Sequence, residues 1–222
     1  MRLARQKERW PVPLQNRVDP YGQIHAAQQR GIFTGNRGVI HDPETRTLLR
    51  RRWTTKAWII CSLEHPRGIR REPMGRNSPS GGAGWTELFF LDEPTALAAG
   101  HRPCFYCRRE AAKLFRQCFS GSPSAPEMDA ILHAGRLASG GTAQQLTPAE
   151  VAALPDGAFV ADSERAFAVR SGQLLPWSFG GYGGPMPVAK NADYQLLTPS
   201  ATVTALKNGY TPNWHSSAAG AP

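Results

Sequence analysis

Two cysteines three positions apart give this chain its clearest chemical signal. Cys104 and Cys107 form a Cys-x-x-Cys motif that follows a turn containing Gly100 and Pro103 and precedes a helical segment. Thiolates at this spacing supply half of a tetrahedral zinc site, and the partial positive charge at a helix N-terminus favours the thiolate form. We therefore expect Cys104 and Cys107 to bind Zn²⁺, with Cys107 in the first turn of a helix over residues 108–119.

A tetrahedral site needs two further ligands, and another segment of the chain offers them. Cys61 and His65 form a Cys-x3-His pair at the end of an apolar run. His101 is an alternative to His65 as the fourth ligand, and His41 is a further one. The competing interpretation is that Cys61 is a thiol packed in the core at the end of a buried strand.

Several short motifs between residues 53 and 110 follow one another in the order found in a known family. They comprise a threonine-containing segment that leads to a cysteine, an apolar Phe-Phe segment, an alanine-rich segment and Ala-Gly-x-Arg-Pro-Cys-x2-Cys. In this chain they occupy residues 53–61, 88–91, 95–100 and 101–108. This region resembles the metal-binding domain of the bacterial Ada family, which repairs methyl phosphotriesters in DNA. The likeness is most specific at the Cys-x-x-Cys motif.

The resemblance implies a zinc site built from both segments, with Cys61 at the position of the methyl-accepting cysteine. This chain departs from the family pattern at three places: His65 stands where the family has a second cysteine, His101 replaces a phenylalanine, and the loop over residues 75–84 is longer. The chain as a whole also resembles a group of bacterial proteins that share the segment 86–109, which begins TELFFLDE.

Basic residues are concentrated in the N-terminal third of the chain. The net charge is +9, and residues 1–76 contain 16 Lys and Arg against 6 Asp and Glu. Most of the basic residues are Arg, which binds phosphate in a bidentate manner. We expect nucleic acid as a partner, with DNA favoured, although a solvated basic surface would give the same composition. The candidate contact residues are Arg50, Arg51, Arg52, Trp53, Arg67, Arg70, Arg71 and Arg76.

Length and composition predict a globular, α+β protein. The chain has 222 residues, of which 41% are hydrophobic, and no apolar run approaches the length of a membrane span. The first ten residues lack the apolar core of a signal peptide, so we expect a cytoplasmic protein without membrane contact. We divide it into a basic extension (1–15), a zinc-binding α+β domain (16–120) and a helical linker with a β-rich part (121–222). The last two could pack as one domain, and the sequence leaves the oligomeric state open.

Short strands and helices are predicted to position the cysteines. Residues 47–53 and 57–61 read as a hairpin, 88–91 as a buried strand, and Glu93-Pro94 as the start of a helix that Gly100 stops. The remaining expected elements are strands near 23–25, 31–33 and 38–40, helices over 127–137 and after Thr147, strands over 158–161, 166–170, 174–177 and 194–197, and a last helix ending at 208–209. Cys118 is expected in the core of its helix.

Three functions are compatible with these features. The first is a zinc-stabilised protein that contacts nucleic acid through its Arg-rich half, with Trp53 or Trp58 stacking on bases. The second is an enzyme in which the zinc-bound thiolate of Cys61 accepts a methyl group, as the Ada resemblance implies. The third is a structural zinc site in a protein-interaction module.

Overall fold

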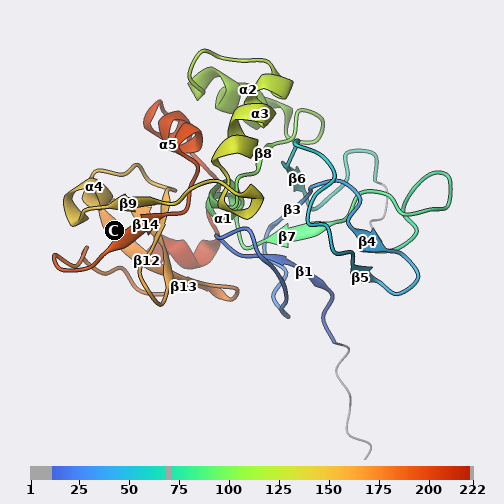
Figure 1. Cartoon of the computed structure of the whole chain (residues 1–222), viewed down its shortest axis with the longest axis horizontal. Helices are drawn as coiled ribbons and strands as arrows, with labels where there is room; N and C mark the ends of the chain where they lie inside the picture. Colours follow the sequence, from blue (N-terminus) through green and yellow to red (C-terminus); the bar gives the residue numbers. More distant parts are fainter. Residues whose placement is uncertain (1–11, 69–71, 221–222) are drawn as a thin grey trace, which may run out of the picture.

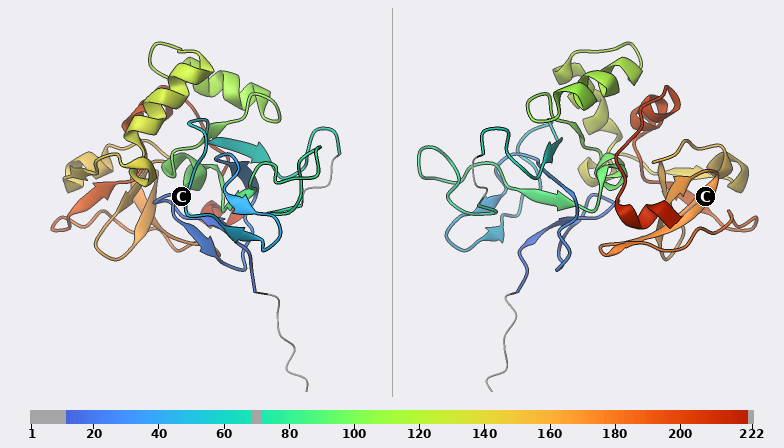
Figure 2. Two further views of the ribbon diagram at one scale, coloured as in Figure 1. Left: turned by 45° about the vertical axis from the view of Figure 1, so that its right-hand side comes forward. Right: turned by 180° about the vertical axis from the view of Figure 1, so that it is seen from behind.

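The computed structural model describes residues 12–68 and 72–220 and places them in an α+β fold (Figure 1). Within this described part, short strands form two six-stranded sheets and a separate two-stranded hairpin. The sheets lie on either side of a central helix, as the two further views also show (Figure 2). The predicted α+β class is thereby confirmed. Most of the basic extension predicted for residues 1–15 falls outside the described residues, and Gln15 already begins the first strand.

The first sheet carries the cysteine-bearing strand. Its strand order is β2-β1-β7-β3-β6-β8. The strands are β1 (Gln15–Val18), β2 (Ile24–Ala26), β3 (Phe33–Asn36), β6 (Ile59–Ser62), β7 (Leu88–Phe90) and β8 (Arg102–Pro103). β7 is buried along its whole length, as expected for a continuous apolar run covered on both faces. β6 pairs antiparallel with β3 and parallel with β8.

The hairpin predicted between residues 47–53 and 57–61 is wrong. β5 (Thr47–Leu48) pairs instead with β4 (His41–Asp42), and β6 joins the interior of the first sheet. The apolar residues of β6 gain more burial between β3 and β8 than beside a polar, exposed partner strand. The sequence indicated β structure in both segments, but the first strand is limited to Thr47–Leu48, and the pattern did not specify which strands pair.

Helix α1 (Glu93–Ala98) begins and ends as the sequence predicts. The Asp92 carboxylate accepts the backbone N–H of Thr95 at 3.0 Å, and Pro94 occupies the first turn. Gly100 ends the segment with a φ of +79°, a conformation that glycine adopts without strain. A Cβ atom there would also lie 2.3 Å from the Arg136 side chain, so the site excludes larger residues.

The longer helices pack beside α1. They are α2 (Arg109–Cys118), α3 (Ala125–Gly135) and α5 (Ser200–Lys207), with one-turn 3-10 segments at Leu137–Ser139 and Ser216–Gly220. α3 starts two residues earlier than predicted, because Ser124 and Glu127 form a reciprocal capping box. The predicted capping box at Thr147 and Glu150 is present and opens α4 (Pro148–Ala152).

The second sheet is antiparallel throughout and has the order β13-β12-β11-β10-β14-β9. Its strands are β9 (Gln144–Leu146), β10 (Phe159–Ala161), β11 (Ala166–Arg170), β12 (Gln173–Ser178), β13 (Gly181–Tyr182) and β14 (Tyr194–Leu196). The turn between β11 and β12 has positive φ at Ser171 and Gly172, which matches the right-handed twist of a hairpin. The predicted β-rich C-terminal part is confirmed, and β9 is an addition to it.

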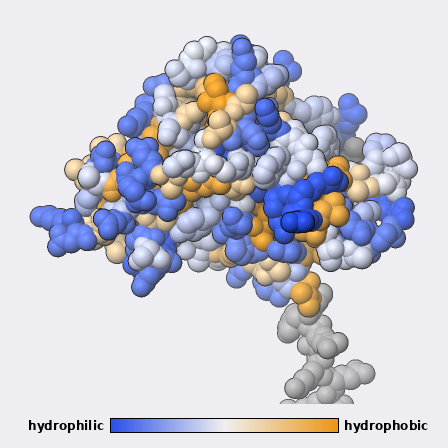
Figure 3. All heavy atoms as spheres, viewed as in Figure 1, coloured by the Kyte–Doolittle hydropathy of each residue, from blue (hydrophilic) through white to orange (hydrophobic). Residues whose placement is uncertain are grey.

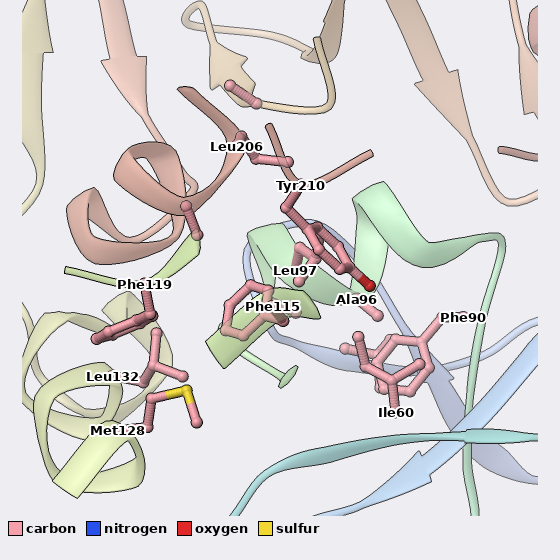
Figure 4. Close-up of a cluster of buried hydrophobic side chains, with 14 of the residues drawn as sticks. Ile60, Phe90, Ala96, Leu97, Phe115, Phe119, Met128, Leu132, Leu206 and Tyr210 are labelled. Atoms are coloured by element: carbon pink, nitrogen blue, oxygen red, sulfur yellow. The ribbon is translucent and has the colours of Figure 1, made fainter. Parts of the chain in front are cut away.

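One hydrophobic core joins the N-terminal and C-terminal halves of the chain (Figure 4). Ile60 and Phe90 of the first sheet belong to the same buried cluster as Phe115 of α2 and Leu206 and Tyr210 near the C-terminus. Residues of both predicted domains therefore belong to one buried cluster, beside which lie two smaller ones. No helix in the described part of the chain is long and apolar enough to cross a membrane.

Candidate metal centre

Three cysteines from two segments meet at one end of the first sheet. The sulfur atoms of Cys61, Cys104 and Cys107 all lie within 4.8 Å of one another. Sulfurs around a tetrahedral zinc ion lie about 3.8 Å apart, given zinc–sulfur bonds of about 2.3 Å. With at most a small contraction, the three sulfurs would therefore occupy three vertices of a zinc site. The three thiols can hold a metal ion, as the spacing of Cys104 and Cys107 predicted.

Parallel pairing of β6 with β8 brings the two segments together. The backbone N–H of Cys104 donates to the carbonyl of Ile60 at 3.0 Å. This bond places Cys104, which directly follows β8, beside Cys61 of β6. This contact joins residues more than forty positions apart. Because β8 is an edge strand, the proline within it costs the sheet no ladder hydrogen bond.

The Cys-x-x-Cys segment forms a tight turn around the Cys104 sulfur. The backbone N–H of Arg108 donates to the Cys104 carbonyl at 3.0 Å, and the N–H of Tyr106 points at the Cys104 sulfur at 3.4 Å. α2 begins at Arg109, so Cys107 lies two residues before the helix and not in its first turn. The predicted helix over 108–119 is close to α2 in extent, but Cys107 precedes the helix instead of lying in its first turn.

Mutual hydrogen bonds shift the pKa values of the three thiols in different directions. Hydrogen bonds from Cys107 and Cys61 lower the pKa of the Cys104 thiol to about 2. The same hydrogen bonds to Cys104 raise the pKa of Cys61 and of Cys107, and burial raises both further. These shifts favour the thiolate at Cys104 and the protonated thiol at Cys61 and Cys107, so binding a metal ion through all three sulfurs would release protons.

The three thiols line a pocket of about 560 Å³. Cys61 and Cys104 are each 8% exposed, whereas Cys107 is more accessible. Two large aromatic side chains at this pocket are exposed, Trp85 at 63% and Tyr106 at 56%. Besides these residues the pocket is lined by Gly35, Asn36, Ile59, His65, Arg67, Glu72, Asn77 and Glu87. A metal bound by the three thiolates would thus have a fourth position that faces the pocket.

The structure places His65 beside the thiol cluster but outside the group that could hold a metal directly. Its ring lies 6.0 Å from that of Tyr106, and its Nδ1 accepts the backbone N–H of Arg67 at 3.2 Å. Nε2 is the remaining nitrogen with which His65 could complete a site. Reaching the metal would require its loop to move inward.

His101, the second choice for the fourth ligand, lies in the core and does not join the cysteines. Its ring packs against Trp58 and Phe90, and its Nε2 accepts the Nε–H of Arg37 at 3.2 Å. Burial and the nearby charges of Arg37 and Arg136 keep the pKa of His101 well below its usual value. Its imidazole therefore fills the position of an aromatic core residue.

The other single candidates also have structural roles. Both ring nitrogens of His41 are hydrogen-bonded, to the Thr86 hydroxyl at 2.6 Å and to the Gly75 carbonyl at 3.1 Å. Cys118 lies in the main core cluster, in agreement with its predicted position inside the helix.

The residues predicted to contact nucleic acid form three groups: the arginines at 50–52, Trp53, and the arginines that follow the Cys61 strand. Arg50, Arg51 and Arg52 are exposed, and neither Arg50 nor Arg51 has a carboxylate partner among the described residues. Hydrophilic side chains gather on the surface over the region of β4 and β5 (Figure 3). Trp53 is 37% exposed and contacts the rings of Trp58 and His133.

The arginines after the Cys61 strand differ from one another. Arg67 lies at the thiol pocket, with its guanidinium 5.9 Å from the centre of the Tyr106 ring. Arg76 forms an ion pair with Glu44, so its charge is already compensated. Arg70 and Arg71 fall outside the described residues.

Several residues at the pocket were not predicted from the sequence. Tyr106 sits within the Cys-x-x-Cys motif, so its position could have been inferred from the motif itself. Trp85 and Asn77 reach the pocket because the loop over 75–84 folds back. The Asn77 side chain accepts the backbone N–H of Gly84 at 2.7 Å and donates to the Trp85 carbonyl at 3.0 Å. No local sequence pattern reports this closure.

Comparisons of the chain with protein-family models, with curated proteins and with solved structures found no match.

Proposed function

We propose that this protein binds Zn²⁺ through Cys61, Cys104 and Cys107 and contacts nucleic acid, preferably DNA, at the surface around that site. Thiolate ligands favour zinc over the hard cations magnesium and calcium. His65 or a group of the bound partner would supply the fourth ligand. The metal would fix β6 to the turn before α2, because these two segments provide all three sulfurs.

The observation that carries the nucleic-acid part is the composition of the pocket rim. Trp85 and Tyr106 expose most of their rings beside the thiols, and Arg67 lies against Tyr106. Exposed aromatic rings are unfavourable in water and often mark a binding surface. Nucleic-acid bases stack on such rings, and each stacked base contributes about 1–3 kcal/mol of binding free energy. Arginine beside an aromatic ring supplies the phosphate contact that single-strand binders combine with stacking.

A binding assay with matched variants tests this proposal. We expect the zinc-loaded protein to bind single-stranded DNA in an electrophoretic or anisotropy assay, and Trp85→Ala or Tyr106→Ala to weaken binding about tenfold. Leu114→Ala is the control, since Leu114 is an exposed apolar residue of α2 that does not line the pocket. Equal binding by the Trp85, Tyr106 and Leu114 variants would contradict the proposal, as would no binding to DNA or RNA at low salt.

A methyl-acceptor function is the second candidate, because the three sulfurs line a pocket that a small electrophile could enter. Zn²⁺ held by Cys61, Cys104 and Cys107 would keep these sulfurs deprotonated. One cysteine thiolate would attack the methyl carbon, the carbon–oxygen bond of the phosphotriester would break, and the released phosphodiester would take the electron pair. The resemblance to the Ada family assigns acceptance to Cys61, whereas exposure favours Cys107. Peptide mass mapping after incubation with DNA that carries methyl phosphotriesters distinguishes them. Absence of any methylated cysteine would remove this candidate and leave the binding proposal intact.

A further inference from the structure

A second pocket lies next to the thiol pocket, and His65 lines both. This pocket has a volume of about 650 Å³ and lies against the face of the first sheet where β1 and β7 run parallel. Arg17 of β1 pairs in register with Phe89 of β7, and Arg30 approaches from the segment before β3. None of Arg17, Arg30 and Phe89 was a candidate site residue in the sequence.

Two guanidinium groups share one aromatic ring in this pocket. The guanidinium carbon of Arg17 lies 5.0 Å from the centre of the Phe89 ring, and that of Arg30 lies 4.6 Å from it. Burial and the charge of Arg30 lower the pKa of Arg17. Arg17 is half-buried and Arg30 is exposed, and their like charges repel each other, so an anion that contacts both guanidinium groups would stabilise the arrangement.

The hydrogen-bond donors of the two arginines are only partly used. Nε of Arg17 donates to the Gln29 carbonyl at 2.6 Å and Nη1 to the Asn16 side chain, while Nη2 makes no hydrogen bond within the described residues. In that same part of the chain, Arg30 forms no hydrogen bond or ion pair. Glu64 also lines the pocket but is exposed and pairs with neither arginine.

We propose that Arg17 and Arg30 bind a phosphate group, and that this phosphate belongs to the nucleic-acid strand whose neighbouring nucleotide occupies the thiol pocket. Guanidinium forks match phosphate oxygens in pairs, and both guanidinium carbons lie within 5.0 Å of the centre of the Phe89 ring. Because His65 lines both pockets, they adjoin each other, and one extended strand can place a phosphate in the Arg17–Arg30 pocket and a base or a backbone ester in the thiol pocket. The assignment to a strand rests on the proposed function, whereas the phosphate site itself does not.

Two measurements test the site. In the first, the zinc-loaded protein reacts with phenylglyoxal, which modifies accessible arginines, with and without inorganic phosphate, and the modified residues are mapped by mass spectrometry. We expect phosphate to protect Arg30 and Arg17 but not the exposed Arg116 of α2. The second measures affinity for a single-stranded oligonucleotide at several salt concentrations. The variant is Arg17→Gln/Arg30→Gln, and the control is Arg116→Gln/Lys207→Gln, which removes the same charge from exposed positions outside both pockets.

We expect the Arg17→Gln/Arg30→Gln variant to bind about tenfold more weakly than the control, with the slope of log affinity against log salt shallower by about 0.7 for each lost phosphate contact. Equal affinity and slope in the variant and the control, together with no protection by phosphate, would overturn the proposal while the nucleic-acid function stands. If the wild-type protein binds no oligonucleotide but phosphate still protects Arg30, the nucleic-acid function fails. The phosphate site then stands as one for a small phosphorylated molecule. Retained circular dichroism and zinc content show whether each variant is folded.

Discussion

Replacing Glu93 with glutamine tests whether a buried ion pair holds the metal centre in position. Arg108 directly follows Cys107, and its guanidinium donates to both Glu93 carboxylate oxygens, at 2.7 and 2.9 Å. The side chains are 6% and 1% exposed. Glu93 also accepts the Tyr210 hydroxyl and the backbone N–H of Asn213, so one carboxylate connects the cysteine turn with the C-terminal segment.

The expected loss of stability in Glu93→Gln follows from the burial of this ion pair. Removing one partner of a buried ion pair costs about 3–5 kcal/mol, because the other charge remains without a counterion in a poorly hydrated site. Glutamine keeps the shape of glutamate and part of its acceptor capacity, so we expect a loss of about 3 kcal/mol in the free energy of unfolding. The matched control is Glu110→Gln. Its pair with Lys113 is 82% and 49% exposed and should contribute less than about 1 kcal/mol.

Urea unfolding of the zinc-loaded protein, followed by circular dichroism, measures both variants. Zinc affinity by chelator competition gives a second readout, and we expect Glu93→Gln to weaken it about tenfold because the Cys107 turn loses its support. A Glu93→Gln/Arg108→Met variant removes both charges and should recover part of the lost stability.

Two results would refute this reasoning. One is a loss of unfolding free energy in Glu93→Gln that is no larger than the loss in Glu110→Gln. The buried pair would then contribute little to the stability of the fold. The other is a double variant as unstable as the sum of its two single changes, because then the two side chains would not be coupled.

Three further predictions follow from the site and its surroundings. Elemental analysis should find about one zinc per chain, and Cys104→Ser/Cys107→Ser should lose it along with most of the folded population; full occupancy in that variant would exclude the thiol site. Burial lowers the pKa of His101 in the folded protein, so below about pH 6.5 this imidazole takes up a proton only in the unfolded chain. The stability that neutral His101 provides above that pH is therefore lost as the pH falls. Below pH 6 the wild type should therefore lose about 1.4 kcal/mol more per pH unit than His101→Phe, and parallel pH profiles from urea titrations would contradict this. Changing Arg50, Arg51 and Arg52 together to alanine should flatten the salt dependence of DNA binding, whereas an unchanged slope would assign those arginines to solvated surface.

Local rules in the sequence determined much of the secondary structure. The cap at Asp92, the stop at Gly100, the capping box at Thr147 and the turn at Ser171-Gly172 all act within four or five residues. Interactions over such short distances depend little on the rest of the fold, so the residue types are sufficient to specify them. The spacing of Cys104 and Cys107 belongs to the same class, because the turn between them brings their sulfurs together.

The tertiary structure alone decided which distant residues became neighbours. The apolar run that ends at Cys61 indicated β structure, but only its pairing with β3 and β8 placed Cys61 beside the other thiols and disproved the expected hairpin. His101 has the same side chain as a zinc ligand, yet the packing of Trp58 and Phe90 makes it a core residue. Arg17 and Arg30 show no motif at all, since a parallel strand pair and an adjoining loop create their pocket. The sequence thus specified contacts between residues that are near neighbours along the chain. Contacts between distant residues depend on the burial of the whole core, which no short segment encodes.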